Sequence, residues 1–349
     1  MKKVAIVAHG LSNGGAERVA SILANHFAAK GYDILFIAAY SDDKQYFLDE
    51  RIAIAAIRSK KKNKLFRLID RNIKIYQELK KFGADTVFSF ITNELIWSQI
   101  KGLSVIFSLR NDPNHVDNTF IASRLRQFAY KNAKHIVFQT QGAADYFSEQ
   151  ICLKSSIIAN PLQTSNFPFW FKHNHRKTFM TACRLNKQKN IPMLIRAFVE
   201  IHKQYPEYTL EVYGKGELKN ELNDMIVQSD ATSYIHLLGN VNNIHEKMSE
   251  CAGFILPSDY EGLSNSMLEA LAVGIPCICT DCPPGGAREF IKNEVNGLLT
   301  PVGDEKAMYD AIEKLILNPD MGYSFSKYSS RIRRDLDAKV ICEKWEKLI

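Results

Sequence analysis

Short apolar runs alternate with amphipathic segments along the whole 349-residue chain. A short apolar run bounded by polar or glycine-rich turns is typical of a buried strand, and apolar residues at every third or fourth position indicate a helix. The first such pair is a strand at 3–8 and a helix at 14–30, joined by a glycine-containing loop. Further strands are predicted in the first half at 34–39, 52–57, 86–90, 105–109 and 136–139.

A second alternating series begins after a linker at 160–174, where prolines and aromatic residues mix with polar ones. Its predicted strands are 178–183, 210–213, 234–238, 253–256 and 277–279. Regular alternation of strand and helix favours a parallel sheet covered by helices on both faces. We therefore predict an α/β protein with two Rossmann-like, doubly wound domains, residues 1–165 and 166–334. Such sheets bind ligands outside the carboxyl ends of their strands, so we expect the two domains to face an interdomain cleft.

The net charge of +7 belongs to the first half of the chain. Residues 1–165 hold 23 Lys and Arg against 14 Asp and Glu, and the basic residues at 58–71 lead into an apolar pattern. A basic amphipathic helix of this kind suits an anionic membrane surface, although a solvated loop before an ordinary surface helix explains the pattern equally well. No nucleic-acid-binding motif accompanies the charge, so nucleic acid is not expected as a partner.

The cysteines and the apolar runs bear on cofactors and on location. Seven cysteines spread along a long chain are expected to be reduced thiols, as in a cytoplasmic protein. Cys277, Cys279 and Cys282 lack the paired spacing and the fourth ligand of a zinc site, and they are expected to fill the core. The Asp-x-Asp at 335–337 is remote from the other motifs and is expected at the surface, so no metal is predicted. Neither a secretion signal nor a membrane-spanning run is found, so a cytoplasmic location is expected.

The stretch from 257 to 276 carries the most chemical information. An apolar strand ends there at a proline, a polar loop follows, and apolar residues then recur at helical spacing. Unpaired N–H groups and the positive end of the helix dipole at Ser264, Asn265 and Ser266 suit an anion such as a phosphate. The pattern indicates a loop and helix start that bind an anionic group.

Two glutamates flank this helix start. Glu261 lies in the loop before it, and Glu269 lies about two turns into the segment, where a carboxylate can accept hydrogen bonds from hydroxyl groups. Taken alone, the two glutamates also fit an ordinary capped helix with surface carboxylates. The pair is separated by seven residues and framed by Pro-Ser before and Gly-x-Pro after. This framed pattern resembles the signature of the retaining nucleotide-sugar glycosyltransferases of family four.

The resemblance implies a role for each matching residue. In that family the first glutamate lies beside the donor sugar, which gives Glu261 a catalytic role, and the second, here Glu269, holds the donor ribose. Backbone amides between them hold the pyrophosphate, and the matching residues here are Gly262, Leu263, Ser264, Asn265 and Ser266.

Two further segments resemble the family's phosphate-binding loops. Arg184 and Lys189 match an Arg-Leu-x-x-x-Lys segment that binds the donor diphosphate, where a guanidinium can bind two phosphate oxygens and an ammonium adds a point charge. Near the start of the chain, a paired glycine lets the backbone approach a ligand at a helix start. Gly15 is assigned there to a phosphate of the donor or acceptor, and Asn13 to the acceptor side.

A third segment departs from the family pattern. Many members have a histidine at the end of a first-domain strand, near the sugar, but this chain has Arg110 there and His115 five residues later. A structural role for His115 in a loop is at least as well supported as catalysis. Arg110 and His115 are therefore candidates for the acceptor side only.

The resemblance covers nearly the whole chain and implies the GT-B fold, in which the last helix, here at about 335–349, returns to the first domain. It also implies a retaining, metal-independent transfer of a hexose or hexosamine from a nucleotide diphosphate sugar, which is a co-substrate and not a cofactor. UDP is the expected nucleotide, and the expected acceptor is a glycan, free or linked to polyprenyl diphosphate, in bacterial surface polysaccharide synthesis. The alternatives are a nucleotide-sugar epimerase and a non-catalytic scaffold that binds sugar nucleotides.

Overall fold

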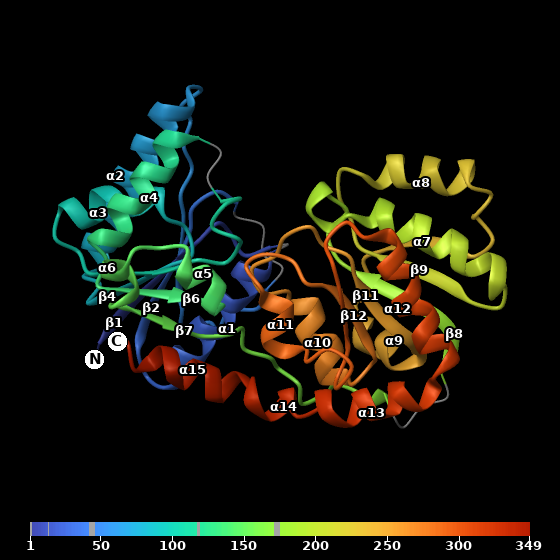
Figure 1. The fold of residues 1–349 in the computed structure, drawn as a ribbon. Coiled ribbons are helices and arrows are strands. Elements are labelled where there is room, and N and C mark those ends of the chain that lie inside the picture. Colours follow the sequence, from blue (N-terminus) through green and yellow to red (C-terminus); the bar gives the residue numbers. More distant parts are fainter. Residues whose placement is uncertain (1, 13, 42–45, 117–118, 171–174) are drawn as a thin grey trace. The chain divides into compact units, whose positions relative to one another are not determined.

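The chain divides into two compact units in a computed structural model (Figure 1). The structure describes all residues except 1, 13, 42–45, 117–118 and 171–174. The first unit comprises Met1–Pro161 and Ala338–Ile349, and the second comprises Leu162–Asp337. The chain passes between the units after Pro161 and again after Asp337. Next to these two points, Leu162 donates its backbone N–H to the carbonyl of Leu336 over 2.8 Å, so the first and last segments of the second unit are bonded to each other.

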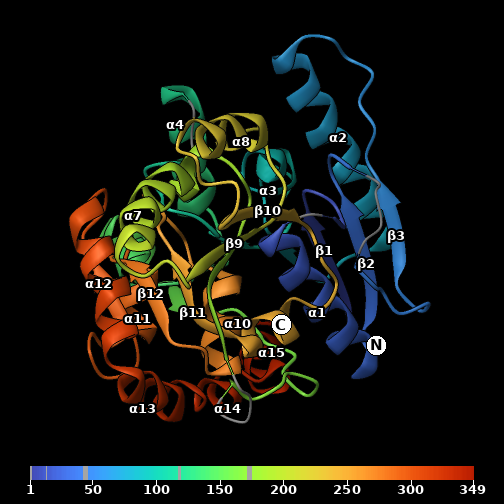
Figure 2. The same ribbon diagram turned by 90° about the vertical axis from the view of Figure 1, so that its right-hand side faces the viewer.

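In its described part the first unit has a parallel sheet of seven strands in the order β3-β2-β1-β4-β5-β6-β7. Figure 2 shows β1, β2 and β3 side by side in this order. Residues 4–8 of β1 are fully buried, as expected for a strand with helices on both faces. The strands are β1 (Lys3–Ala8), β2 (Asp33–Ala38), β3 (Ala53–Ala56), β4 (Thr86–Ser89), β5 (Val105–Ser108), β6 (His135–Phe138) and β7 (Ser155–Ile157).

Aromatic packing connects the C-terminal helix to the core of the first unit. Phe27 stacks on Phe88 with ring centroids 5.7 Å apart, and Trp345 meets the same Phe88 edge-on at 5.6 Å. Trp345 is fully buried, so the last helix is an integral part of this unit. The helices are α1 (Gly15–Ala29), α2 (Lys64–Phe82), η1 (Asn93–Leu95), α3 (Ile96–Ile100), α4 (Phe120–Lys131), α5 (Gln141–Asp145), α6 (Glu149–Cys152) and α15 (Ala338–Glu346).

The described part of the second unit has a parallel sheet of six strands in the order β10-β9-β8-β11-β12-β13. The chain starts this sheet near its middle, at β8, extends it to one side through β9 and β10, and then returns to add β11 on the other side of β8. The strands are β8 (Arg176–Ala182), β9 (Thr209–Tyr213), β10 (Ile235–Gly239), β11 (Cys251–Leu256), β12 (Cys277–Thr280) and β13 (Leu298–Thr300).

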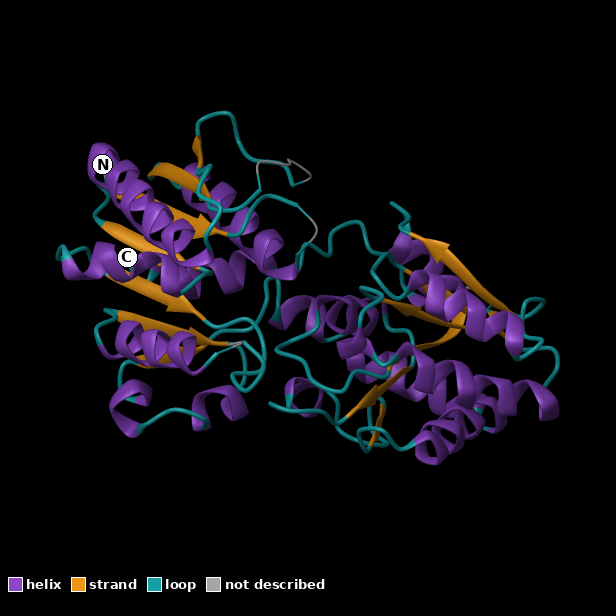
Figure 3. Ribbon diagram, turned by 90° about the horizontal axis from the view of Figure 1, so that it is seen from above, coloured by secondary structure: helices purple, strands orange, loops and turns teal. Residues whose placement is uncertain are grey.

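The helices of the second unit begin and end at residues suited to those positions. Asn190 adopts a left-handed conformation with φ of 43° and caps α7, where Pro192 fits the first turn. Gly274, with φ of 92°, ends α10. Figure 3 shows helices packed alongside the strands of each unit. The helices are η3 (Lys187–Lys189), α7 (Ile191–Gln204), α8 (Lys219–Gln228), α9 (Ile244–Glu250), α10 (Asn265–Val273), α11 (Gly286–Phe290), α12 (Glu305–Leu317), α13 (Pro319–Ser329) and α14 (Ile332–Asp335).

The structure confirms the predicted α/β class, with two doubly wound parallel sheets. Each strand predicted from the sequence is present, and two further strands, β7 and β13, were not predicted. Both are three residues long and lie at the edge of their sheets. No described helix combines the length and the apolar character needed to cross a lipid bilayer.

Candidate functional site

In the second sheet, β9 and β10 add to one side of β8, and β11 then adds to its other side. The order of strand addition therefore reverses between β8 and β11, and we call this point the β8 and β11 reversal. The loops that follow these two neighbouring strands leave the same edge of the sheet, because all its strands are parallel. Ligands of open α/β sheets bind outside the carboxyl ends of the strands at such a reversal. The loop after β8 contains Arg184 and Lys189, and the loop after β11 contains Glu261.

Lys189 and Glu261 meet across this reversal. The Lys189 Nζ and the Glu261 Oε1 form an ion pair, and both residues are buried, with 7% and 9% of their surface exposed. Ser258 donates a hydrogen bond to the same Oε1 over 2.9 Å, and the Gln188 Nε2 lies 3.4 Å from Oε2. A buried carboxylate is stable only when paired and hydrogen-bonded, and these three partners provide both interactions.

Hydrogen bonds hold the two loops to each other. The backbone N–H of Asp259 donates to the carbonyl of Gln188 over 2.9 Å, and the Gln188 side chain donates to the carbonyl of Tyr260, also over 2.9 Å. The Asn190 side chain donates to the carboxylate of Asp259 over 2.7 Å. The positions of Lys189 and Glu261 are therefore fixed by backbone contacts as well as by their own charges.

The predicted anion-binding segment 262–266 lies at the start of α10. Ser264 is the N-cap of this helix, and its hydroxyl accepts from the backbone N–H of Met267 over 3.4 Å. The first turn contains no acidic residue, so the positive end of the helix dipole is not neutralised from within. The structure thus provides a helix start whose amides and dipole suit an anion.

A close backbone contact fixes the start of this segment. A Cβ atom added to Gly286, the first residue of α11, would lie 2.2 Å from the carbonyl oxygen of Gly262. Only glycine allows the two backbones to come this near. The backbone N–H of Glu261 also donates to the carbonyl of Pro283 over 2.9 Å. The loop after β12 and the start of α11 therefore pack directly against the start of the predicted anion-binding segment.

Glu269 is buried in α10 beside a histidine that the sequence analysis did not select. The His245 Nε2, from α9, lies 3.2 Å from the Glu269 Oε2. The ring of Phe167 stacks on His245 with centroids 3.7 Å apart and planes inclined by 27°. His245 follows β10 in the chain, so its place beyond the carboxyl end of a predicted strand was the signal that could have identified it.

Arg184 differs from Lys189 in its exposure. Its side chain is exposed, and it makes no hydrogen bond or ion pair with any residue that the structure describes. An exposed guanidinium near the β8 loop is available to bind an anion from solvent. The structure therefore places the two predicted cations on one loop, with one buried and one exposed.

In the first unit, Arg110 lies in a polar cluster at the carboxyl end of β5. Its guanidinium donates to the Asn160 Oδ1 over 2.7 Å and to the Ser108 hydroxyl over 3.3 Å, and it lies 5.4 Å from the centre of the Phe90 ring. Burial lowers the pKa of Arg110 to about 9, and the nearby Glu17 opposes this shift. Arg110 therefore stays protonated at neutral pH.

His115 and the glycine-rich loop before α1 are the other predicted acceptor-side segments of the first unit. The His115 Nδ1 lies 2.8 Å from the Oδ2 of the buried Asp112, three residues earlier in the same loop. Gly15 is exposed and begins α1, and the Glu17 carboxylate covers Gly14. Asn13 lies outside the described residues.

The three clustered cysteines fill the core, as the sequence analysis predicted. Cys277, Cys279 and Cys282 are at most 2% exposed. Burial raises the pKa of the Cys282 thiol to about 12 and that of Cys279 well above its ordinary value, so both stay protonated at neutral pH. In the part of the chain that the structure describes, no group of three or more His, Cys, Asp or Glu side chains is arranged to hold a metal ion.

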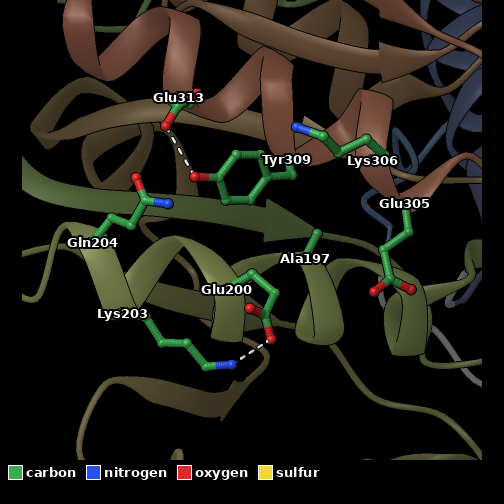
Figure 4. A pocket seen from close by; sticks show the side chains of 8 residues that line it. All are labelled: Ala197, Glu200, Lys203, Gln204, Glu305, Lys306, Tyr309 and Glu313. Carbon is green, nitrogen blue, oxygen red and sulfur yellow. Dashed lines mark hydrogen bonds and ion pairs between the residues drawn. The ribbon is translucent and has the colours of Figure 1, made fainter.

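A surface groove of about 620 Å³ lies between α7 and α12 (Figure 4). Two pairs of lining side chains interact with each other: Lys203 donates to Glu200 over 2.7 Å, and Tyr309 donates to Glu313 over 2.9 Å. None of the predicted site residues lines this groove. The candidate site is therefore the set of loops at the β8 and β11 reversal and not this groove.

Comparison with known proteins shows what the second unit resembles. Residues 163–331, which include Arg184, Lys189, Glu261 and Glu269, match the family model described as glycosyl transferases group 1. A similar protein from Erwinia amylovora, the amylovoran biosynthesis glycosyltransferase AmsD, is 26% identical over the full length of both chains. A Campylobacter jejuni protein is 26% identical over 90% of both chains, and it is named N-acetylgalactosamine-N,N'-diacetylbacillosaminyl-diphospho-undecaprenol 4-alpha-N-acetylgalactosaminyltransferase.

The fold of the chain is also similar to that of a solved structure over nearly its whole length. The Anabaena protein HepE, solved in complex with UDP and glucose, superposes with a TM-score of 0.83 at 18% identity and covers 99% of both chains. This likeness extends over both units, and it confirms the two-domain α/β fold that the family resemblance implied. Residues 163–331, just under half of the chain, therefore match the group 1 glycosyltransferases, and the chain has the GT-B fold.

Proposed function

We propose that this glycosyltransferase is a retaining, metal-independent enzyme that transfers a hexose or hexosamine from a UDP-sugar to a lipid-linked glycan during the synthesis of a bacterial surface polysaccharide. The observation that carries the proposal is the ion pair that joins Lys189, in the loop after β8, to Glu261, in the loop that leads from β11 to the start of α10. A sugar nucleotide has a diphosphate between two hydroxylated groups, and these segments carry both cations and carboxylates.

Each predicted residue has a role in this proposal. Arg184, Lys189 and the amides at 262–266 bind the diphosphate, and Glu269 accepts hydrogen bonds from the ribose hydroxyls. Glu261, held by Ser258 and Lys189, lies beside the transferred sugar and orients its hydroxyl groups. Gly15 adds backbone amides toward a phosphate, and Arg110 and His115 belong to the acceptor side.

The chemistry follows from these charges. The bond between the sugar C1 and the diphosphate oxygen breaks, and the nucleoside diphosphate leaves with the electron pair. The acceptor hydroxyl bonds to C1 on the face that the leaving group vacates, and its proton passes to a phosphate oxygen of the departing donor. Preorganised cations and amides stabilise the charge that develops on the diphosphate, so neither a metal ion nor a separate base is needed.

The names of the relatives support the choice of nucleotide and acceptor. The Campylobacter relative is named for a diphospho-undecaprenol substrate, and the Erwinia relative for amylovoran biosynthesis. The Anabaena structure contains UDP and glucose. By similarity to these proteins, we propose that the donor is linked to UDP and that the acceptor glycan is carried on a polyprenyl diphosphate.

A lipid-linked acceptor requires the enzyme to work at a membrane surface, and α2 has the properties of a membrane contact. Leu65 and Phe66, in its first turn, are 63% and 60% exposed, and the preceding segment 58–64 is rich in lysine. At the start of α4, Phe120 and Ile121 are 74% and 70% exposed. Exposed apolar side chains beside basic ones favour binding to an anionic lipid surface.

The test is turnover by the purified protein with a panel of UDP- and GDP-sugars and lipid-linked glycan acceptors, with and without a chelator. We expect one UDP-sugar to be consumed only when an acceptor is present, at the same rate with chelator, and with retention of the anomeric configuration in the product. The Glu261→Gln variant is expected to lose at least about 100-fold in kcat, because a group that acts on the transition state is removed.

Each other outcome supports a different conclusion. Interconversion of a sugar nucleotide without acceptor would support an epimerase, and binding without turnover by any acceptor would support a non-catalytic scaffold. Loss of turnover with chelator, restored by a divalent cation, would contradict metal independence while leaving the transferase assignment intact. An inverted product would contradict the retaining mechanism alone.

A further inference from the structure

His245 lies next to Glu269, the residue predicted to bind the ribose, and its ring is held in place by packing. One face of its ring is stacked on Phe167, with centroids 3.7 Å apart. The carbonyl of Phe167 in turn accepts a hydrogen bond over 3.1 Å from Arg333, whose guanidinium also donates to the carbonyl of Ala272 in α10. The histidine is therefore held by groups that are themselves fixed to the helix carrying Glu269.

The ring nitrogen of His245 that faces Glu269 is Nε2, and it has no other hydrogen-bond partner among the described residues. The Nε2 of His245 is buried and makes no aligned hydrogen bond with any described residue, while the Glu269 Oε2 lies 3.2 Å away. Buried polar atoms in proteins are nearly always hydrogen-bonded, so an atom left in this state calls for an explanation. Hydrogen bonds at functional sites are often poorly aligned without ligand and tighten when the ligand binds.

We infer that His245 is a positioning residue for Glu269: it donates its Nε2–H to one carboxylate oxygen and so orients Glu269 toward the ribose hydroxyls of the donor. The inference rests on the proposed ribose-binding role of Glu269 and adds a residue from the start of α9, the helix that follows β10. The Glu269 side chain is 6% exposed, so its orientation is set mainly by the protein groups packed around it. An orientation imposed by a rigid neighbour lowers the entropy that ligand binding must remove.

The inference is tested by the binding of UDP and of 2′,3′-dideoxy-UDP, which lacks the hydroxyl groups that Glu269 would recognise. For His245→Ala we expect the Kd of UDP to rise about tenfold, because a hydrogen bond to a charged group is lost. The Kd of the dideoxy analogue is expected to stay within about twofold of the wild-type value. In turnover, KM for the donor rises and kcat changes little, since the chemical step lies at the other glutamate.

Two further variants separate positioning from a loss of stability. His245→Gln keeps an N–H donor and is expected to recover most of the preference for UDP over its dideoxy analogue. His202→Ala is the matched control, because His202 stacks on Tyr234 with centroids 3.5 Å apart in the same unit, and its Nδ1 lies 3.1 Å from the carbonyl oxygen of Tyr208. It is expected to leave both Kd values unchanged, and thermal denaturation of each variant reports its folding.

The outcomes distinguish this inference from the proposed function. If Glu269→Ala loses the preference for UDP and His245→Ala keeps it, the inference is wrong and the ribose role of Glu269 stands. If Glu269→Ala also keeps the preference, the ribose role is wrong and the inference with it. An equal loss of both nucleotides in His245→Ala would show a structural role only. Failure of the wild-type protein to bind UDP or GDP would overturn the proposed donor site itself.

Discussion

The ion pair between Lys189 and Glu261 places opposite charges in an environment that water scarcely reaches. Removing a carboxylate and an ammonium from water costs several kcal/mol for each ion, and their mutual attraction recovers this only with good geometry and additional hydrogen bonds. Ser258 and Gln188 supply such bonds to the carboxylate. Each charge therefore depends on the other for its stability in the folded protein.

This dependence predicts a stability effect that accompanies the loss of activity. Glu261→Ala leaves the Lys189 ammonium buried without its partner, and we expect a loss of about 3 kcal/mol in the free energy of unfolding. The double variant Glu261→Gln with Lys189→Met has no buried charge at this position and is expected to regain at least half of that loss. Urea denaturation measures both. Wild-type stability of Glu261→Ala would contradict the structural importance of the pair.

Much of the candidate site could be predicted from the sequence, because its residues lie close together within short segments of the chain. The 261–269 pattern and the loop at 184–189 were each identified because they resemble short motifs of a known family. The contact between Lys189 and Glu261 was not predicted, since it depends on how two loops from neighbouring strands close. His245 was missed for the same reason: only the packing of α9 against α10 brings it to Glu269.

The strands in the centre of each sheet were predicted from the sequence, whereas the edge strands β7 and β13 were not. Central strands are buried on both faces and appear as continuous apolar runs, as at 4–8. Strand β7 consists of Ser155, Ser156 and Ile157, and β13 has only three residues. A short strand at an edge is defined by its one hydrogen-bonded neighbour, and this contact leaves little trace in local sequence.

Helix α2 supports a prediction about membranes. Leu65→Ser together with Phe66→Ser removes two of its exposed apolar side chains, and each buried side chain of this size contributes about 1.5–3 kcal/mol to transfer from water. We expect binding to vesicles containing phosphatidylglycerol to fall more than about tenfold in co-sedimentation, and binding of the wild-type protein to weaken as salt concentration rises.

A second exposed leucine serves as the control for α2. Leu153, 82% exposed in the same unit, follows α6 and has no lysine-rich segment of comparable length beside it. Leu153→Ser is therefore expected to bind vesicles as the wild-type protein does. Equal losses in both variants, or equal binding of the wild-type protein to phosphatidylcholine vesicles, would contradict a basic amphipathic contact through α2.

The buried thiols make the stability of the whole fold depend on pH. Burial raises the pKa of Cys251 and of Cys282 to about 12 each. Because the folded pKa exceeds the unfolded value of about 8.5, the contribution of each thiol is complete below that pH and is lost as the pH rises toward the folded pKa. Each thiol is expected to lower the free energy of unfolding by about 2 kcal/mol between pH 8.5 and pH 10.

Chemical denaturation at pH 7.5, 8.5 and 10 measures this dependence. Replacing Cys282 with alanine removes one titrating group, so the variant is expected to lose less stability between pH 8.5 and pH 10 than the wild-type protein does. A slope unchanged by the replacement would show that the thiol at 282 ionises alike in the folded and unfolded states. The comparison uses slopes, and so it is independent of the cavity that alanine leaves.

The two-sheet architecture was the part of the whole molecule best predicted from the sequence. Alternating strand and helix patterns recur through both halves, and the prolines of the linker mark where one series stops and the next begins. The return of α15 to the first unit was expected from the family resemblance and not from the pattern itself. Its cause is visible in the packing of Trp345 against Phe88 and Phe90, which no local pattern encodes.

The contact between Gly262 and Gly286 has a consequence for protein engineering. Exchanging the donor loop between related enzymes is a natural route to new sugar specificity, yet this loop rests directly on the backbone of another one. A transplanted 257–266 segment with a different backbone course would collide with α11 or leave a gap beside it. Chimeras should therefore transfer segments 257–266 and 281–290 together, as one module.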